Sequence, residues 1–331
     1  MNIEDISSMG AVSHLEEKFS VKKISENVYE GKYPLESFME GARGTYGGEF
    51  IAQSIIAAWE TVEDPGFTPN SMHSYFVRAG NCDSVMRYEV LRSNDGRNFA
   101  NRTVQCYQSA TNQLCFTLII SFAKNNSAKE KAIAYENDTT GKITPQFGFQ
   151  SSPQYFLKKY RDHLNKLPYF QHTNENLQHI LPKEFIDTKS TATIFNRKEP
   201  GDRKLGVFVR VNDDLTLAKN ATKTKFASLG FASDSFWLST IIRVLGLPVS
   251  GKYLNFFRVS LDHSIWFHDK DFDPTEWMFM DFKFTRLEND RLLAHCQVFT
   301  LEGVCVATVT QEALAFIPKN LLDKFPSKSK L

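Results

Sequence analysis

Apolar residues, broken by polar ones, concentrate in four segments in the first third of the chain, and each segment is rich in the residues typical of a β-strand. The four segments are residues 72–78, 86–93, 100–109 and 113–124. Turn-forming residues such as Asn94-Asp95-Gly96-Arg97 separate them and predict an antiparallel meander. Ahead of the meander, Tyr46-Gly47-Gly48 opens a predicted apolar helix at 50–59, and residues 20–29 form a candidate opening strand.

The last part of the chain has the same order of predicted elements. A helix is predicted at 236–245, after Ser233-Asp234-Ser235, and strand-like segments precede it at 191–195 and 205–211. Four further strands are predicted at residues 256–268, 277–287, 291–300 and 304–316. A helix followed by an antiparallel meander is an α+β pattern, in which a curved sheet wraps one helix in each half.

Residue identities that recur at a fixed separation indicate a duplication. The pairs separated by 190 residues are His73-Ser74 with His263-Ser264, Cys106 with Cys296, and Cys115 with Cys305. A shorter match at a separation of 186 residues relates the two predicted helices, from Phe50 and from Phe236. Two copies of one unit explain these matches, and 331 residues are enough for two domains.

Residues 125–180 have no counterpart in this repeat and are rich in Asn, Lys, Gln, Ser and Thr. Within them, Ser152 as N-cap and Pro153 at the first helical position predict a short helix to about residue 166. The predicted organisation is a first unit at 1–124, a polar linker at 125–180, a second unit at 181–320 and a tail at 321–331.

The composition disfavours several classes of function. Lys and Arg total 39 and Asp and Glu total 38, so the chain lacks the basic character of a nucleic-acid-binding protein. Five cysteines without paired short spacings favour buried thiols in a reducing compartment over disulfides or a zinc site. The 28 Phe residues fill a core, or suit a protein that lodges an alkyl chain.

Both ends of the chain bear on its location. Residues 1–10 contain Glu4 and Asp5 without a continuous apolar block, which is not the pattern of a secretory signal. The longest apolar run, 114–123, is too short to span a bilayer, so we expect no membrane span. The last residues, Ser329-Lys330-Leu331, spell the signal that the peroxisomal import receptor reads at a free terminus, and they predict the peroxisomal matrix. A frayed tail with this sequence by chance is the alternative.

Four runs resemble one enzyme family. Residues 46–53 (YGGEFIAQ) and 73–80 (HSYFVRAG) are similar to the first half of the type II acyl-CoA thioesterases, and 261–268 (LDHSIWFH) and 310–313 (TQEA) to the second half. With the C-terminal Ser-Lys-Leu, the chain resembles the peroxisomal branch. The resemblance implies a tandem, or double, hotdog fold, with two long helices each cradled by an antiparallel sheet and the sheets joined. It also implies hydrolysis of medium- to long-chain acyl-CoA to fatty acid and CoA, with no metal or organic cofactor, by a homo-oligomer.

The resemblance also implies that Asp234, Ser260 and Gln311 hold the attacking water, with Ser260 preserving the hydroxyl of a family threonine. Alternatively, Asp234 is an ordinary N-cap, where the helix dipole would lower the pKa of its carboxyl and favour orienting the water. Gln311 shares a strand face with apolar residues, so it needs a partner, either in the site or in the backbone. Strict alternation places Ser260 on the opposite face, unless the strand begins or bulges there.

The first half lacks this trio at the positions matched by the repeat, which predicts one site per chain. Those matched positions are Gly48, Asn70 and Ser121. His73 and His263 occupy matching places, and we expect the ring of His263 to be bonded to backbone. His73 is a second-tier catalytic candidate, because the first sheet can border the site of the second.

Two other functions remain open. A hotdog-fold enoyl-CoA hydratase would carry an Asp-x-Asn-Pro-x-His motif, which this sequence lacks. A non-catalytic acyl-CoA binding protein would need an apolar channel but no polar trio. Candidate groups for the thioester carbonyl or the CoA phosphates are the backbone at Gly47-Gly48 and the side chains of Arg78, Arg97 and Arg102, which can equally be loop or strand-end residues.

Overall fold

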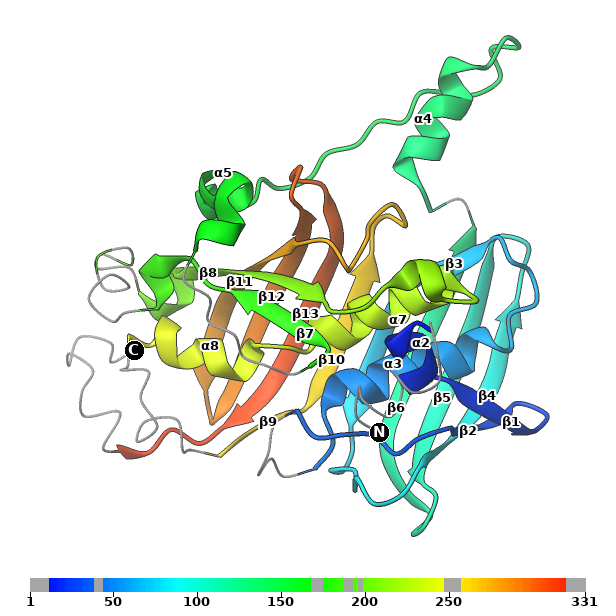
Figure 1. The fold of residues 1–331 in the computed structure, drawn as a ribbon, viewed down its shortest axis with the longest axis horizontal. Coiled ribbons are helices and arrows are strands. Elements are labelled where there is room, and N and C mark those ends of the chain that lie inside the picture. Colours follow the sequence, from blue (N-terminus) through cyan, green and yellow to red (C-terminus); the bar gives the residue numbers. More distant parts are fainter. Residues whose placement is uncertain are drawn as a thin grey trace.

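The computed structural model describes residues 12–38, 44–124, 126–167, 175–186, 193, 195, 199–246 and 257–319. One antiparallel sheet runs through both halves of the chain, and helices α3 (Gly47–Trp59) and α7 (Ala221–Ser233) lie side by side against it (Figure 1). Residues 1–10, almost all of 191–195, and Ser329-Lys330-Leu331 lie outside the described residues.

Each strand of the two predicted meanders is present, and the segment 256–268 is divided into two strands. The first half contains β1 (Val21–Ser25), β2 (Val28–Gly31), β3 (Phe67–Phe76), β4 (Met86–Asp95), β5 (Phe99–Gln108) and β6 (Gln113–Lys124). The second half contains β7 (Leu177–Ile180), β8 (Lys204–Val211), β9 (Arg258–Ser260), β10 (Asp262–Phe267), β11 (Met278–Glu288), β12 (Arg291–Thr300) and β13 (Cys305–Ala315). Asn289 and Asp290 join β11 to β12 with φ of 53° and 56°, the left-handed values that a tight hairpin turn requires.

Helices α3 and α7 run antiparallel and contact each other along their length. Near the start of α3, a Cβ at Gly48 would lie 2.4 Å from the carbonyl oxygen of Phe231, so only glycine permits this approach. At the other end, Glu60 after α3 forms a 2.7 Å ion pair with Lys223 in the first turn of α7. Almost every residue of α3 is buried, which explains why most of its side chains are apolar.

The two halves meet where β3 pairs with β10, and Ser74 lies directly opposite His263. Outward from this pair the strands follow in the same order on both sides, β3-β6-β5-β4 and β10-β13-β12-β11. On the next strand outward, Leu118 of β6 lies beside Ser74, and Gln311 of β13 lies beside His263. Other residues that this register places in equivalent positions are Cys106 with Cys296 and Met86 with Met280. Ser74 and Leu118 are therefore the counterparts of His263 and Gln311.

The sequence match of His73 with His263 is wrong as a structural equivalence. Successive strand residues point to opposite faces of a sheet. His263 is buried on the face covered by the helices, whereas His73 is exposed on the other face. The reason is that the connections between equivalent strands differ in length, so the separation is 189 residues for Ser74 and His263 but 190 for Cys106 and Cys296.

The predicted central helix of the second half is also wrong. The central helix is α7, and its first residue follows that of α3 by 174 residues rather than 186. The predicted segment forms a separate helix, α8 (Trp237–Val244), in the longer connection between α7 and the strands. The sequence of α7 contains Thr, Lys and Ser at many positions, so the hydrophobic pattern pointed to the more amphipathic α8.

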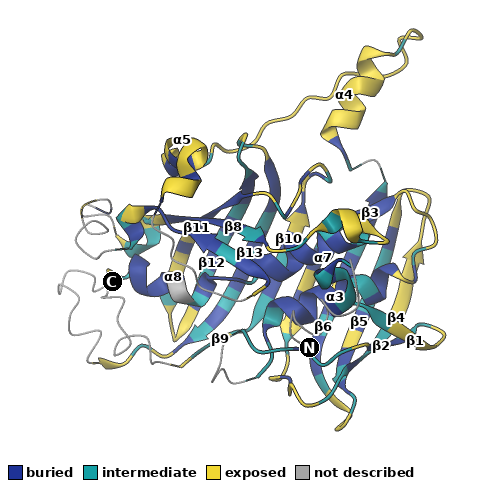
Figure 2. Ribbon diagram, viewed as in Figure 1, coloured by how far each residue is buried: buried dark blue, intermediate teal, exposed yellow. Residues whose placement is uncertain are grey.

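The linker contains two helices. The predicted one is α5 (Tyr155–Tyr160), which continues as a 3₁₀ turn to Lys166 and begins two residues later than expected. The second, α4 (Ala128–Glu136), projects from the body with no buried residue (Figure 2). The strand β7 hydrogen-bonds to β8, so residues 177–180 belong to the sheet rather than to the linker. No helix in the described ranges is long and apolar enough to cross a membrane.

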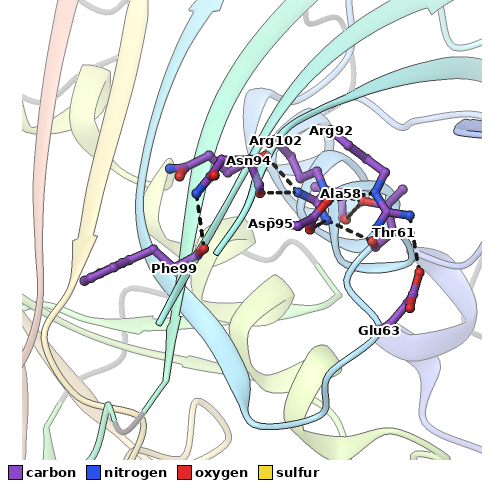
Figure 3. Close-up of polar contacts among 9 residues, drawn as sticks. Ala58, Thr61, Glu63, Arg92, Asn94, Asp95, Phe99 and Arg102 are labelled. Atoms are coloured by element: carbon purple, nitrogen blue, oxygen red, sulfur yellow. Dashed lines mark hydrogen bonds and ion pairs between the residues drawn. The ribbon is translucent and has the colours of Figure 1, made fainter. Parts of the chain in front are cut away.

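Arg102 is fully buried on β5 and fastens the end of α3 (Figure 3). Its guanidinium donates to Thr61 Oγ1 at 2.6 Å and to the Thr61 carbonyl at 3.0 Å. The remaining N–H groups donate to the carbonyl oxygens of Asn94 and Asn101, both at 2.9 Å, and to the carboxylate of Asp95. With all donors engaged, Arg102 is a structural residue and not a ligand for a CoA phosphate.

Replacing Arg102 by Leu should lower the free energy of unfolding by about 3 kcal/mol, because the buried hydroxyl and carbonyl groups of Thr61 lose a donor. Urea unfolding measures the change. Arg97→Leu, at an exposed position in the neighbouring turn, is the control and should change stability by about 0.5 kcal/mol or less. Equal stabilities for the two variants would contradict this role.

Candidate active site

Three separate segments bring Asp234, Ser260 and Gln311 together. The amide Nε2 of Gln311 lies 3.2 Å from Asp234 Oδ1 and donates a second hydrogen bond to Ser260 Oγ. Asp234 follows α7, Ser260 ends β9 and Gln311 lies in β13. The structure thus places the three predicted side chains within hydrogen-bonding reach of one another.

Asp234 is the C-cap of α7 and not the N-cap of the following helix. Its side chain is 7% exposed, and a Cβ at Gly47 would lie 2.6 Å from its Oδ2, so the start of α3 closes over the carboxylate. Burial raises the pKa of Asp234 to about 7, and hydrogen bonds from Gln311 and from the Gly48 N–H oppose the rise only in part. The expected lowering of this pKa is therefore wrong, because loss of hydration outweighs the donors.

The position of Ser260 depends on an interruption at Leu261. Ser260 pairs with Ala313 of β13, and the N–H of Leu261 donates to the Glu312 carbonyl at 2.8 Å before β10 begins at Asp262. The interruption changes the alternation, so Ser260 faces Gln311 while Val259 is exposed. Of the two readings of the sequence, the one with a strand boundary beside Ser260 is correct.

Gln311 is buried on an otherwise apolar face of β13, at 2% exposure. Its Oε1 lies 3.1 Å from Nδ1 of His263, whose Nε2 lies 2.9 Å from Ser233 Oγ. The ring of His263 is therefore bonded to two side chains, not to backbone as expected. Burial lowers the pKa of His263 to about 4, so the ring is neutral near pH 7.

His73 does not join this group. It is exposed on the opposite face of the sheet, with Nδ1 3.1 Å from Ser264 Oγ and its ring against Trp266. Because the sheet separates His73 from Asp234 and Gln311, the structure gives no geometric support to a catalytic role for it.

The equivalent place in the first half has a different set of side chains. Glu60 follows α3 as Asp234 follows α7, but it is ion-paired with Lys223. Leu118 stands in place of Gln311 and Ser74 in place of His263. Leu118 has no side-chain hydrogen-bond donor, so the first half cannot form the same group of polar contacts.

Two family models match the chain. One, described as the acyl-CoA thioesterase N-terminal domain, matches residues 35–123, and the acyl-CoA thioesterase C-terminal domain matches residues 165–315. The chain is 26% identical to the peroxisomal acyl-coenzyme A thioester hydrolase 1 of Saccharomyces cerevisiae, over 91% of this chain and 94% of that protein. It is 27% identical to acyl-CoA thioesterase 2 of Haemophilus influenzae, over 89% and 94%.

Solved structures of similar architecture agree with this match. An acyl-CoA thioesterase II of Mycobacterium marinum has a TM-score of 0.65 at 24% identity, covering 92% of this chain and 99% of that one. A hot dog fold protein from Alicyclobacillus acidocaldarius has a TM-score of 0.60 at 13% identity, covering 92% and 98%. The chain therefore has a hotdog fold of the α+β class.

Asp234→Asn should make the protein more stable at pH 8, by up to about 3–4 kcal/mol, since it removes a buried carboxylate that ionises reluctantly. A carboxyl whose pKa is raised in the folded state binds its proton more tightly there, so its contribution to stability falls as pH rises from about 4 to about 7. Urea unfolding at pH 4.5 and pH 8 measures both effects. The exposed Asp83→Asn is the control, and an Asp234→Asn effect that is equal at both pH values would refute the assignment.

Proposed function

The chain belongs to the type II acyl-CoA thioesterase family and hydrolyses acyl-CoA thioesters, and we propose that Asp234, Ser260 and Gln311 are its catalytic residues. The observation that carries the proposal is the contact of the Gln311 amide with both Asp234 and Ser260 in a buried site. A carboxyl with a pKa of about 7 can accept a proton from water and return it within one turnover.

In the proposed reaction a water molecule binds between Asp234 and Gln311 and attacks the thioester carbonyl. The new C–O bond forms as the water proton passes to Asp234, and the carbonyl oxygen becomes an oxyanion. The Gly47 N–H at the start of α3, next to the Gly48 N–H that donates to Asp234, is a donor of the kind that stabilises such an oxyanion, worth about 3 kcal/mol. The oxyanion then collapses, the C–S bond breaks, and Asp234 gives its proton to the departing CoA thiolate.

Ser260 has a specific part in this scheme. Its oxygen accepts from Gln311, so its own O–H remains free to donate to the water or the carbonyl oxygen. The hydroxyl orients the reactants and does not act as a nucleophile, because the base Asp234 is aimed at water and bonded to Gln311.

The finer organisation is also part of the proposal. We infer two tandem hotdog units joined by a polar linker, with the machinery in the second unit only and one site per chain. The equivalent order of strands and the antiparallel helices support the tandem arrangement, and Leu118 in place of Gln311 supports the single site. Medium- to long-chain acyl groups are the expected substrates, and a homo-oligomer is the expected assembly.

Asp234→Asn and Gln311→Ala should each lower kcat by about a hundredfold or more and change KM by less than about fivefold, because the substrate does not need the water to bind. For the wild type, kcat should rise with pH through about 7 as Asp234 ionises. Release of CoA from a long-chain acyl-CoA, followed with a thiol reagent, measures both. The matched control Glu312→Gln alters the neighbouring side chain on the opposite strand face and should keep wild-type kcat.

The same assay separates the other two functions. Thiol release requires a hydrolase, a new hydroxyacyl-CoA without thiol release would indicate a hydratase, and tight binding without either product would indicate a carrier. Wild-type turnover in purified Gln311→Ala would remove Gln311 from the catalytic group.

We also propose import into the peroxisome, supported by the Ser329-Lys330-Leu331 signal and by the name of the yeast relative, a peroxisomal thioester hydrolase. The chain fused behind a fluorescent protein, with its terminus free, should colocalise with a peroxisomal marker. Removal of Leu331 alone should leave the fusion outside peroxisomes while activity in lysate stays the same. Peroxisomal location of the truncated fusion would contradict this route.

A further inference from the structure

The His263 ring must be in one of two neutral forms, and which one matters for Gln311. Both ring nitrogens have partners, Gln311 Oε1 at 3.1 Å on Nδ1 and Ser233 Oγ at 2.9 Å on Nε2. The ring is fully buried and uncharged near pH 7, so it carries one N–H, donates from one nitrogen and accepts at the other.

We propose that His263, held in its Nδ1–H form by Ser233, is the positioning residue that turns the Gln311 amide toward Asp234 and Ser260. The inference rests on the proposed function, because it concerns how Gln311 comes to present its N–H groups to the base and the hydroxyl.

The amide orientation follows from the position of the ring proton. With the proton on Nδ1, the ring donates to Gln311 Oε1, and both amide hydrogens are left for Asp234 and Ser260. With the proton on Nε2, two acceptors would face each other at 3.1 Å, and the amide would have to turn. Its oxygen would then lie against the carboxylate of Asp234, where the ionised form of the base is disfavoured.

Ser233 is the partner of the ring on its other side. Its hydroxyl has one proton and two acceptors within reach, His263 Nε2 at 2.9 Å and the Gly230 carbonyl at 2.8 Å. Donation to His263 keeps Nε2 as an acceptor and the ring proton on Nδ1. When Asp234 is protonated, the whole chain can reverse, with Asp234 donating to Gln311, Gln311 to Nδ1, Nε2 to Ser233, and Ser233 to Gly230. The first arrangement turns the Ser233 proton from the Gly230 carbonyl to His263, whereas the reversed one returns it to Gly230, so the ring form is linked to the charge of Asp234.

The first half of the chain supports a link between the two side chains. The counterpart of Gln311 is Leu118, and the counterpart of His263 is Ser74, so the amide and the ring are absent together. A histidine needed only to fill the core would be expected at either place. Ser74 instead donates to the backbone carbonyl of His263 at 2.7 Å and secures the strand that carries the ring.

His263 does not act as a base itself. Its Nδ1 is 3.8 Å from Asp234 Oδ1, beyond hydrogen-bonding distance, and it faces Gln311. Among the described residues, Tyr46 ahead of α3 is a further titratable group that interacts with Asp234, and burial raises the pKa of Tyr46 well above its ordinary value. With His263 and Tyr46 neutral near pH 7, Asp234 is the group in this cluster that changes charge there.

Two substitutions at His263 separate positioning from packing. His263→Asn places an amide donor near the former Nδ1 and should keep kcat within about fivefold of wild type. His263→Leu has a similar size but no donor, so kcat should fall by about fiftyfold with KM within about threefold. The acid limb of its kcat–pH profile should also move up by about 0.5–1 pH unit, because Asp234 loses a secured donor. The control is His295→Leu in β12, on the face of the sheet away from the helices, and this variant should match wild type.

Thermal unfolding of each variant shows whether it is folded, and a direct measurement does not depend on the variants. In the wild-type chain labelled with 15N-histidine, NMR at pH 8 should show the His263 proton on Nδ1, with the signal assigned by its loss in His263→Asn. Ser233→Ala should move part of the population to Nε2 and lower kcat by about three- to tenfold. A wild-type proton on Nε2, or equal kcat in folded His263→Asn and His263→Leu, overturns the inference. Full activity in Gln311→Ala would instead overturn the proposed function on which it rests.

Discussion

The site depends on the antiparallel contact of two buried helices, which forces a carboxylate out of water. The end of α7 lies against the start of α3, with Gly47 and Gly48 allowing the backbones to meet. Asp234 is enclosed at this point. The positive end of one helix and the amide of Gln311 both favour its charge, yet burial is the largest effect and the pKa rises to about 7. A carboxyl exposed to water, with a pKa of about 4, would be too weak a base for the same task.

This constraint makes the site a product of both halves of the chain. The second half supplies Asp234, Ser260 and Gln311, whereas the first half supplies the helix start that closes over the carboxylate. At the opposite end of the helix pair, Glu60 is ion-paired with Lys223, so its negative charge is neutralised. Asp234, in the equivalent place, has no such cation in the described contacts. In a dimer of identical units a substitution would appear at both ends of the helix pair. Two units fused in one chain can differ in sequence, so the two ends can have different charges.

Much of the fold could be predicted from alternation, and the errors have physical causes. The strands were found because each has one buried face, whereas Gln311 was singled out by the resemblance to a family, and its place on such a face added only that it needs a partner. Helix α7 was missed because contacts with α3, rather than its own periodicity, keep it buried. The face of Ser260 depends on its pairing with Ala313, some fifty residues away, and local spacing holds no record of that partner. The duplication was detected, but the separation of equivalent residues is 189 in β3 and β10 and 190 in β5 and β12, so the match of His73 was displaced by one residue and its face reversed.

Burying one polar group creates a need for the next. Asp234 needs a donor, and Gln311 supplies it; the amide oxygen of Gln311 needs a donor, and His263 supplies it; the second nitrogen of His263 needs Ser233. The chain closes on the last turn of α7, where Ser233 and Asp234 are adjacent. Successive helical residues point about 100° apart, so one residue faces the sheet and the next faces α3. The end of a single helix thus holds both ends of the network, and any shift of α7 against the sheet would disturb the base and its support together.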